Sequence, residues 1–251
     1  MEIKNIVKII KKKLFYNFTI FKNETINLKN NYPYYFHLME IIIYFPIWLI
    51  KLNANSLSDE KPWIPFKSYV YLKKIIKKDM FVFEYGSGGS TLFFAKRVRK
   101  VISVEHNEIW YLKLKKIIEF KNYKNCKITL IKPEIFKKNN NYDYSDLESY
   151  KSSDDNYKNM SFENYCKVID TYPNYYFDII FIDGRSRPSC VKHSVNKLKI
   201  NGYLIIDDSD RCSYRKIYNY LNNDQWQRID FIGPKPYVSW FTKLSVWIKI
   251  Y

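Results

Sequence analysis

Acidic residues follow short, largely apolar runs at four separate points of the chain. The four sets are Glu84 after residues 80–83, Glu105 after 101–104, Asp183 after 177–182, and Asp207 with Asp208 after 202–206. Each run has the length and composition of a buried strand. Ligands of open α/β sheets bind beyond the carboxyl ends of the strands, so we expect these carboxylates to surround one crevice. A single acid in such a place usually caps a loop, whereas an ordered set of acids indicates a ligand site.

Three glycines follow the first of these acids, within the segment from Glu84 to Thr91. Ser90 and Thr91 are good helix N-caps, and the apolar residues 92–95 continue as a helix. A strand, a glycine loop and a helix in this order form a nucleotide-cofactor site. Glycines let the backbone approach the ligand, and the first amides of the helix point into the crevice. A carboxylate two residues before the first glycine suits a cofactor with an ammonium group better than a dinucleotide diphosphate.

The segment resembles motif I of the class I S-adenosylmethionine-dependent methyltransferases, acid-x-Gly-x-Gly, with Ser90 at the third small position. The order of motifs extends the resemblance over residues 62–250. The resemblance implies that Glu84 meets the amino-acid part of the cofactor and that Glu105 accepts hydrogen bonds from its ribose. The full set of implied cofactor-binding residues is Glu84, Tyr85, Gly86, Ser87, Gly88, Glu105 and His106.

The segment 182–188 resembles an Asp-Gly-Arg signature of bacterial methyltransferases that modify surface polysaccharides or small molecules. The segment 208–214 is similar to the stretch after strand five in those proteins. The resemblance implies the substrate-binding residues Arg185, Arg187 and Arg211, which can hold a sugar acid or a phosphate through bidentate contacts. The alternative is that one or two of these arginines pair with neighbouring aspartates.

Methyl transfer to an oxygen needs proximity and a base, and Asp183 and His193 are the candidate catalytic residues. For His193, which falls within a predicted helix, a structural role is the alternative. Catechol-type O-methyltransferases hold magnesium with an acid after strand four and an acid-Asn pair after strand five. Asp183 and Asp208 match these positions, but Ser209 stands where the Asn would be. Mg²⁺ is therefore a candidate second cofactor beside S-adenosylmethionine.

The elements that must position these residues can be read from the apolar pattern. Strands are expected at 80–83, 101–105, 127–131, 177–183 and 202–208, and helices at 92–95, 108–120, 162–169, 188–198 and 214–221, after a first helix that ends near 77. The last strands, 226–231 and 244–250, should pair antiparallel because no helical pattern lies between them. We expect an α/β fold with a doubly wound, Rossmann-like sheet of five parallel strands plus a C-terminal antiparallel hairpin. The polar segment 137–160 is either a lid or a passive surface insertion.

An N-terminal helical extension, residues 1–60, should precede the methyltransferase domain, residues 61–251. Residues 1–22 form a basic amphipathic pattern, and residues 34–52 are the most apolar stretch of the chain. Glu40 and Pro46 oppose a membrane-spanning helix here. We expect either peripheral contact with an anionic membrane surface or packing on the domain, with a polar linker at 53–61.

Composition narrows the partner classes. The net charge of +17 suggests a nucleic-acid partner. However, Lys, Asn, Ile and Tyr are all unusually frequent, so coding bias accounts for part of this charge. Asp183 is followed by Gly-Arg, unlike the Pro-Pro-aromatic sequence of amino-methylating nucleic-acid enzymes. Four scattered cysteines predict reduced thiols in a cytoplasmic protein, with the inner membrane surface as an alternative location. The expected function is O-methylation of a glycan or another small molecule. The alternatives are an RNA methyltransferase and a nicotinamide-dependent Rossmann enzyme, and Glu84 and the terminal hairpin oppose the latter.

Overall fold

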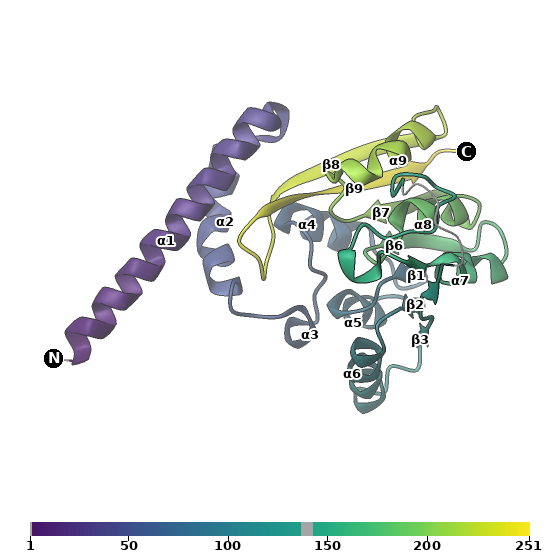
Figure 1. The fold of residues 1–251 in the computed structure, drawn as a ribbon, viewed down its shortest axis with the longest axis horizontal. Coiled ribbons are helices and arrows are strands. Elements are labelled where there is room, and N and C mark those ends of the chain that lie inside the picture. Colours follow the sequence, from purple (N-terminus) through teal and green to yellow (C-terminus); the bar gives the residue numbers. More distant parts are fainter. Residues whose placement is uncertain (1, 137–142) are drawn as a thin grey trace.

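The structure is a computed structural model that describes residues 2–136 and 143–251. Within these residues, one sheet contains seven strands (Figure 1). Their order across the sheet is β3 (Cys126–Leu130), β2 (Lys100–Glu105), β1 (Phe81–Tyr85), β6 (Phe177–Ile182), β7 (Leu198–Ile206), β9 (Phe241–Lys249) and β8 (Trp226–Pro234). The first five strands are parallel, and β9 runs antiparallel to both of its neighbours. The α/β fold with five parallel strands and a C-terminal antiparallel hairpin is therefore confirmed.

Helices connect and cover these strands. The α-helices are α1 (Glu2–Asn31), α2 (Leu38–Lys51), α3 (Ser56–Asp59), α4 (Phe66–Ile75), α5 (Gly89–Ala95), α6 (Glu108–Phe120), α7 (Glu163–Lys167), α8 (Arg187–Ser194) and α9 (Arg215–Tyr220). Short 3-10 helices lie at Pro33–Tyr35, Asp155–Tyr157, Val168–Thr171 and Cys212–Tyr214. A separate two-stranded ladder pairs β4 (Glu134–Ile135) with β5 (Met160–Ser161).

Apolar side chains bury both faces of the parallel strands. Phe83 and Tyr85 of β1 belong to the core on the side of α7, α8 and α9. Val82 of β1 and Phe181 of β6 belong to the core on the side of α4 and α5. Strands that are covered on both faces appear in a sequence as continuous apolar runs, which is why the pattern located them.

The strand order reverses between β1 and β6, because the chain builds outward through β2 and β3 on one side and through β7 on the other. At this junction the loops that follow the two strands approach each other closely. The amide of Asp183 donates a hydrogen bond to the Tyr85 carbonyl at 2.9 Å, and a Cβ on Gly86 would lie 2.8 Å from the backbone of Gly184. A crevice for a ligand is expected at such a junction.

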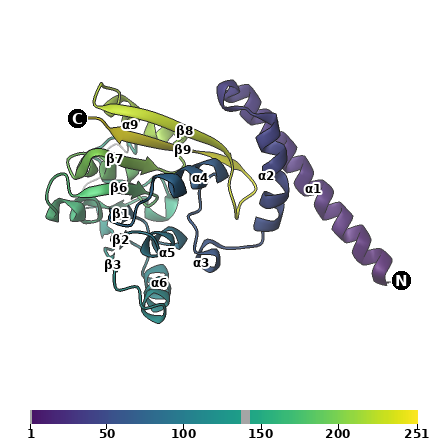
Figure 2. The same ribbon diagram turned by 180° about the vertical axis from the view of Figure 1, so that it is seen from behind.

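The N-terminal helices α1 and α2 pack on the hairpin formed by β8 and β9, and the N-terminal end of α1 points away from the sheet (Figures 1 and 2). Trp48 of α2 is fully buried, and its Nε1 donates to the Val238 carbonyl at 2.9 Å. Phe21 of α1 contacts the rings of Trp48 and Phe241. Packing of this segment on the domain, one of the two expected arrangements, is therefore present.

Among the described residues, no helix combines the length and the apolar character needed to cross a membrane. Pro46 lies inside α2, which continues through it to Lys51.

The segment 53–61, predicted as a polar linker, contains α3 and lies against the start of α5. A Cβ on Gly89 would overlap the carbonyl oxygens of Ser56 and Lys61, so only glycine allows this approach. Leu57 of α3 is buried against Leu92 of α5. The segment thus forms part of the wall next to the glycine loop.

Two predicted elements differ from the structure, and part of a third lies outside it. The helix expected at 188–198 ends at Ser194, because the chain turns there and β7 already begins at Leu198. The helix expected at 162–169 is α7 followed by the 3-10 helix Val168–Thr171. Of the predicted insertion 137–160, residues 137–142 lie outside the described residues, whereas residues 151 and 152 are buried.

Candidate active site

A cavity of about 610 Å³ lies beyond the carboxyl ends of β1, β2, β6 and β7, at the reversal of strand order. This volume falls within the usual range of small-molecule sites. The residues predicted from the sequence that line it are Gly86, Ser87, Gly88, Glu105, His106, Asp183, Arg185, Arg187, Asp208 and Arg211. Lining residues that sequence reasoning missed include Ser56, Trp63, Trp110, Lys235 and Trp240.

Glu105 holds the glycine loop in place. Its Oε2 accepts hydrogen bonds from the amide and the hydroxyl of Ser87, both at 2.9 Å. Its Oε1 accepts from the amides of His106 at 2.8 Å and Asn107 at 2.9 Å. Burial alone would raise the pKa of this carboxyl, but its contacts with His106, Asn107 and Ser87 outweigh burial and hold the pKa below its ordinary value. A carboxylate offers about four acceptor positions, so a ribose hydroxyl must displace the Ser87 hydroxyl to bind here.

We expect Glu105→Ala to weaken the binding of S-adenosylhomocysteine (SAH) by on the order of 1–3 kcal/mol, because the ribose loses a charged acceptor. The measurement is the ratio of calorimetric affinities for SAH and its 2′-deoxy analogue. The ratio should be large in the wild type and close to one in the variant. Ser87→Ala is the control, because it removes only the competing hydroxyl and should keep the discrimination. A Glu105→Ala protein that discriminates as the wild type does would exclude Glu105 as the ribose ligand.

Glu84 does not line the cavity, because β1 continues past it to Tyr85. Its fully buried Oε2 accepts hydrogen bonds from the hydroxyls of Thr91 and Ser103, both at 2.5 Å. The Thr91 hydroxyl in turn accepts from the Gly88 amide at 2.9 Å. Oε1 of Glu84 has no partner among the described residues. Glu84 therefore supports the start of α5 behind the glycine loop, and its implied contact with the cofactor's amino-acid part stays a prediction.

Burial raises the pKa of Glu84 to about 7, which gives a test by pH. The folded state holds this proton more tightly than the unfolded state, so the stabilising contribution is complete below pH 4.5 and is lost as pH rises to 7. A shift of this size corresponds to about 3 kcal/mol. Glu84→Gln cannot titrate, so the wild type should lose about 3 kcal/mol relative to this variant across that range. Urea unfolding at several pH values measures the difference, and a constant difference would contradict the buried, protonated carboxyl.

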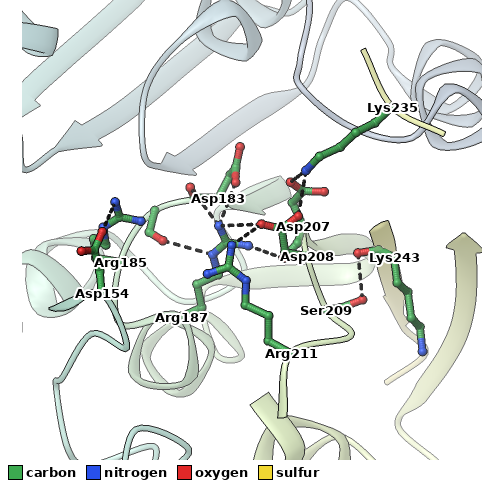
Figure 3. Close-up of polar contacts among 11 residues, drawn as sticks. Asp154, Asp183, Arg185, Arg187, Asp207, Asp208, Ser209, Arg211, Lys235 and Lys243 are labelled. Carbon is green, nitrogen blue, oxygen red and sulfur yellow. Dashed lines mark hydrogen bonds and ion pairs between the residues drawn. The ribbon is translucent and has the colours of Figure 1, made fainter. Parts of the chain in front are cut away.

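Arg187 lies at the centre of a buried ion cluster beside the cavity (Figure 3). Its Nε donates to the Gly184 carbonyl at 3.0 Å, and its Nη1 donates to the carbonyl of Asp207. Its Nη2 donates to Oδ1 of Asp183 at 3.0 Å and lies 3.9 Å from Oδ2 of Asp208. The guanidinium is only 3% exposed. Arg187 thus joins the loop after β6 to the loop after β7. It pairs with aspartates, which was the alternative to substrate binding.

Lys235 reaches the same cluster from the end of β8. Its Nζ lies 2.7 Å from Oδ1 of Asp208 and 3.3 Å from Oδ2 of Asp207, and its side chain is 4% exposed. Burial opposes the charge on Lys235, but the two aspartates outweigh burial and raise its pKa above the ordinary value. The only sequence signal here was the turn pattern of residues 233–236, which says nothing about a cavity.

The three aspartates of the cluster differ in their titration. Burial raises the pKa of Asp207 to about 8 and also raises the pKa of Asp183. For Asp208, the nearby cations Arg187 and Lys235 outweigh burial and lower the pKa. The side chain of Asp183 is 27% exposed and lines the cavity, so it is placed to take up a proton from a ligand.

A second cavity of about 310 Å³ adjoins the first and shares Gly184, Arg185, Arg187 and Arg211 with it. Its other wall comes from residues 151–154. Arg185 pairs with Asp154 at 2.7 Å, and Arg211 pairs with Asp208. Arg185 and Arg211 therefore lie between the two cavities.

Tyr85 and His193 lie away from both cavities. Tyr85 is fully buried, and its hydroxyl donates to the Cys166 carbonyl at 2.6 Å. His193 places Nδ1 at 2.7 Å from Asp170 Oδ2 and Nε2 at 3.2 Å from the Tyr150 hydroxyl. These contacts give His193 the structural role, the alternative to acting as the base.

The side chains at the suggested magnesium position do not fit the ion. Oδ1 of Asp208 is bonded to Lys235 and Oδ2 to Arg211, whereas Asp183 Oδ1 is bonded to Arg187. The hydroxyl of Ser209 is directed at Ser245, 2.7 Å away. Within residues 2–136 and 143–251, no group of three or more His, Cys, Asp or Glu side chains is arranged to hold a metal ion. The tentative magnesium site is thus not supported, because protein cations occupy its carboxylates.

No family model and no curated protein sequence matches the chain. Solved structures do match it. An rRNA methylase from Streptococcus thermophilus aligns with a TM-score of 0.51 and 14% identity over 74% of this chain and 95% of that chain. An O-methyltransferase from Bacillus cereus, in complex with SAH, aligns with a TM-score of 0.50 and 13% identity over 68% of this chain and 74% of that chain.

A methyltransferase from Geobacter sulfurreducens aligns with a TM-score of 0.50 and 12% identity over 76% of this chain and 82% of that chain. The three similarities show that this chain has the fold of class I S-adenosylmethionine-dependent methyltransferases, as the sequence motifs indicated.

Proposed function

We propose that this protein is an S-adenosylmethionine-dependent methyltransferase that methylates an oxygen of an anionic small molecule or glycan. The observation that supports this best is a single cavity that brings the glycine loop, Glu105 and Asp183 together at the reversal of strand order. The same arrangement accounts for the similarity to solved methyltransferases.

The cavity suits the cofactor at its glycine side. A Cβ at Gly88 would meet Trp110 no closer than 3.8 Å, so the backbone there is open to a ligand. Glu105 provides the carboxylate for the ribose once the Ser87 hydroxyl turns away. Bound there, S-adenosylmethionine supplies an electrophilic methyl group on a sulfonium.

Asp183 is the base in this proposal. Its carboxylate faces the cavity, is fixed by Arg187 and has a pKa raised by burial, so it accepts the proton of an acceptor hydroxyl more readily than an ordinary aspartate. The C–O bond forms as the C–S bond breaks, and the electron pair of that bond stays on sulfur. Proximity in the cavity supplies most of the remaining acceleration.

The second cavity is the proposed place for the acidic part of the acceptor. Arg185 and Arg211 lie at its junction with the first cavity, and residues 151–154, including Asp154 paired with Arg185, line another wall. Guanidinium groups hold carboxylates and phosphates through paired hydrogen bonds. A sugar acid or a phosphorylated sugar therefore matches the charge of this wall.

Calorimetric titration with SAH tests the cofactor, and transfer of a labelled methyl group from S-adenosylmethionine tests the acceptor. We expect SAH to bind and label to appear on acidic glycans or sugar phosphates, with neutral sugars as the control. A folded protein that does not bind SAH would overturn the proposal. Label transferred to ribosomal RNA alone would instead support the nucleic-acid alternative, which the net charge of +17 favours.

We further propose that α1 and α2 attach the protein to an anionic membrane surface. Large apolar side chains are exposed on both helices: Ile9, Ile10, Leu14, Phe15, Tyr16 and Phe18 on α1, and Leu38, Met39, Ile42, Ile43, Ile47 and Ile50 on α2. The lysines 11–13 are exposed on α1, and the N-terminal end of this helix points away from the sheet (Figure 2). Apolar insertion and basic residues together drive peripheral binding to anionic lipid.

Flotation with phosphatidylcholine vesicles, with and without phosphatidylglycerol, tests this attachment. Binding should require the anionic lipid and disappear in high salt. Reversing Lys11, Lys12 and Lys13 to Glu should weaken binding more than 100-fold, at about 1 kcal/mol or more per charge change. The same reversal at residues 74, 77 and 78, all exposed on the body of the protein, is the matched control. Self-association without flotation would show that these helices form a protein interface instead.

A further inference from the structure

We propose that the ammonium group of Lys235 takes the place of a divalent cation at this edge of the sheet. The protein then methylates without a metal, and Lys235 supplies the fixed positive charge next to the acceptor oxygen. The role of Lys235 in methylation rests on the proposed function, whereas the replacement of a cation concerns the ion cluster alone.

The position of the ammonium group carries the inference. Nζ of Lys235 lies between Asp207 and Asp208, at 3.3 and 2.7 Å, while its side chain is 4% exposed and lines the cavity. Asp207 is 1% exposed, and its Oδ1 has no partner among the described residues. Carboxylate oxygens arranged around one point in a cavity need a cation, and here a lysine occupies that point.

The surrounding chain fixes the lysine there. Lys235 follows β8 directly and begins the loop to β9. Two contacts from the N-terminal extension hold this loop, one from Trp48 Nε1 to the Val238 carbonyl and one from the Tyr237 hydroxyl to Asp59 at 2.9 Å. The aromatic ring of Trp63 lies 5.5 Å from Nζ. Figure 3 shows Lys235 reaching down to the aspartates, whereas Lys243 points away from them.

The geometry also leaves the group able to act on a ligand. An ammonium group has three N–H donors, and the two aspartates take two of them. The third has no hydrogen-bond partner among the described residues, and Lys235 lines the same cavity as Asp183. A preorganised charge at this place stabilises the negative charge that develops on an acceptor oxygen as Asp183 removes its proton.

Titration with Mn²⁺ tests the replacement, since carboxylate sites bind this ion readily. The wild type should show no saturable binding by calorimetry. Lys235→Ala frees Oδ2 of Asp207 and Oδ1 of Asp208 and should gain a site with a Kd below about 1 mM, which Lys235→Arg should not. Lys243→Ala is the matched control, because this lysine pairs with Asp230 outside the cavity and its loss should create no site.

Two results would overturn the inference. One is saturable Mn²⁺ binding by the wild type that Asp208→Asn abolishes. The other is a folded Lys235→Ala protein that binds no more Mn²⁺ than the wild type. If Lys235→Ala does not fold, Mn²⁺ binding is measured on Lys235→Gln, which is neutral and can still hydrogen-bond the aspartates. Binding no stronger than that of the wild type would again overturn the inference. SAH titration of the wild type in parallel tests the proposed function separately, because the ion cluster does not depend on it.

Discussion

Gly88→Val is expected to weaken SAH binding by at least about 30-fold, or about 2 kcal/mol, in a protein that still folds. The backbone at Gly88 is extended, with φ at 172°, a conformation that valine adopts easily. Its Cβ would stand 3.8 Å from Trp110, an ordinary contact. The rest of the side chain must enter the cavity, because Gly88 lines it, and would occupy the space in which the cofactor approaches the loop.

Gly86 provides the contrast, because its replacement should affect folding first. Its φ is +83°, and a Cβ there would lie 2.8 Å from the backbone of Gly184 and 2.9 Å from the carbonyl carbon of Asp183. Gly86→Ala therefore forces the loops after β1 and β6 apart and should cost more than about 2 kcal/mol of stability. The sequence assigned both glycines to the cofactor. In the structure, Gly86 also allows the loops after β1 and β6 to approach each other closely.

Thermal unfolding and SAH calorimetry on both variants separate the two effects. Gly88→Val should unfold within a few degrees of the wild type, at about 1 kcal/mol or less for the poorer N-cap, and lose affinity. Gly86→Ala should unfold at a clearly lower temperature. Wild-type affinity in a folded Gly88→Val protein would remove the glycine loop from the cofactor site. Wild-type stability in Gly86→Ala would contradict the close approach of the two loops.

The sequence located an acid at the cavity where that acid ends a strand. Glu105 and Asp183 fall at or just after the last residue of β2 and β6, so both side chains reach the cavity. The side chain of Glu84 does not reach the cavity, because β1 extends to Tyr85, two residues beyond the predicted end of the strand at residue 83. A strand residue is confined to one face of the sheet, and for Glu84 that face is the one under α5.

The residues that were missed come from segments without a chemical motif. Ser56 and Trp63 lie in and just after the predicted linker, and Lys235 and Trp240 lie in the loop of the terminal hairpin. Their positions depend on the docking of the N-terminal helices on the hairpin, through contacts such as Trp48 with Val238. Contacts between residues about 190 positions apart leave no periodic signal in the sequence. The part of the cavity wall that these four residues form could therefore not be predicted from it.

Arg187→Met is expected to lower the free energy of unfolding by about 3–5 kcal/mol, because it removes a buried cation that pairs with Asp183 and bonds two backbone carbonyls. The guanidinium is 3% exposed and bonds Asp183 and the carbonyls of Gly184 and Asp207. Arg211→Met is the matched control, since Arg211 is 44% exposed and pairs with Asp208 alone. The control should change stability by about 1 kcal/mol or less, as exposed ion pairs do.

The pH dependence of the Arg187→Met effect distinguishes a charge defect from a packing defect. Without Arg187, the pKa of Asp183 and of Asp207 should rise further, because burial already raises both and the cation beside them is gone. Protonation removes the uncompensated charge, so the destabilisation should be larger above the raised pKa values of these aspartates than below them. Urea unfolding of the wild type and both variants at pH about 5 and 8 measures this. Equal stability of Arg187→Met and the wild type, with weaker binding of an acidic acceptor, would instead give Arg187 the substrate-binding role that the sequence suggested.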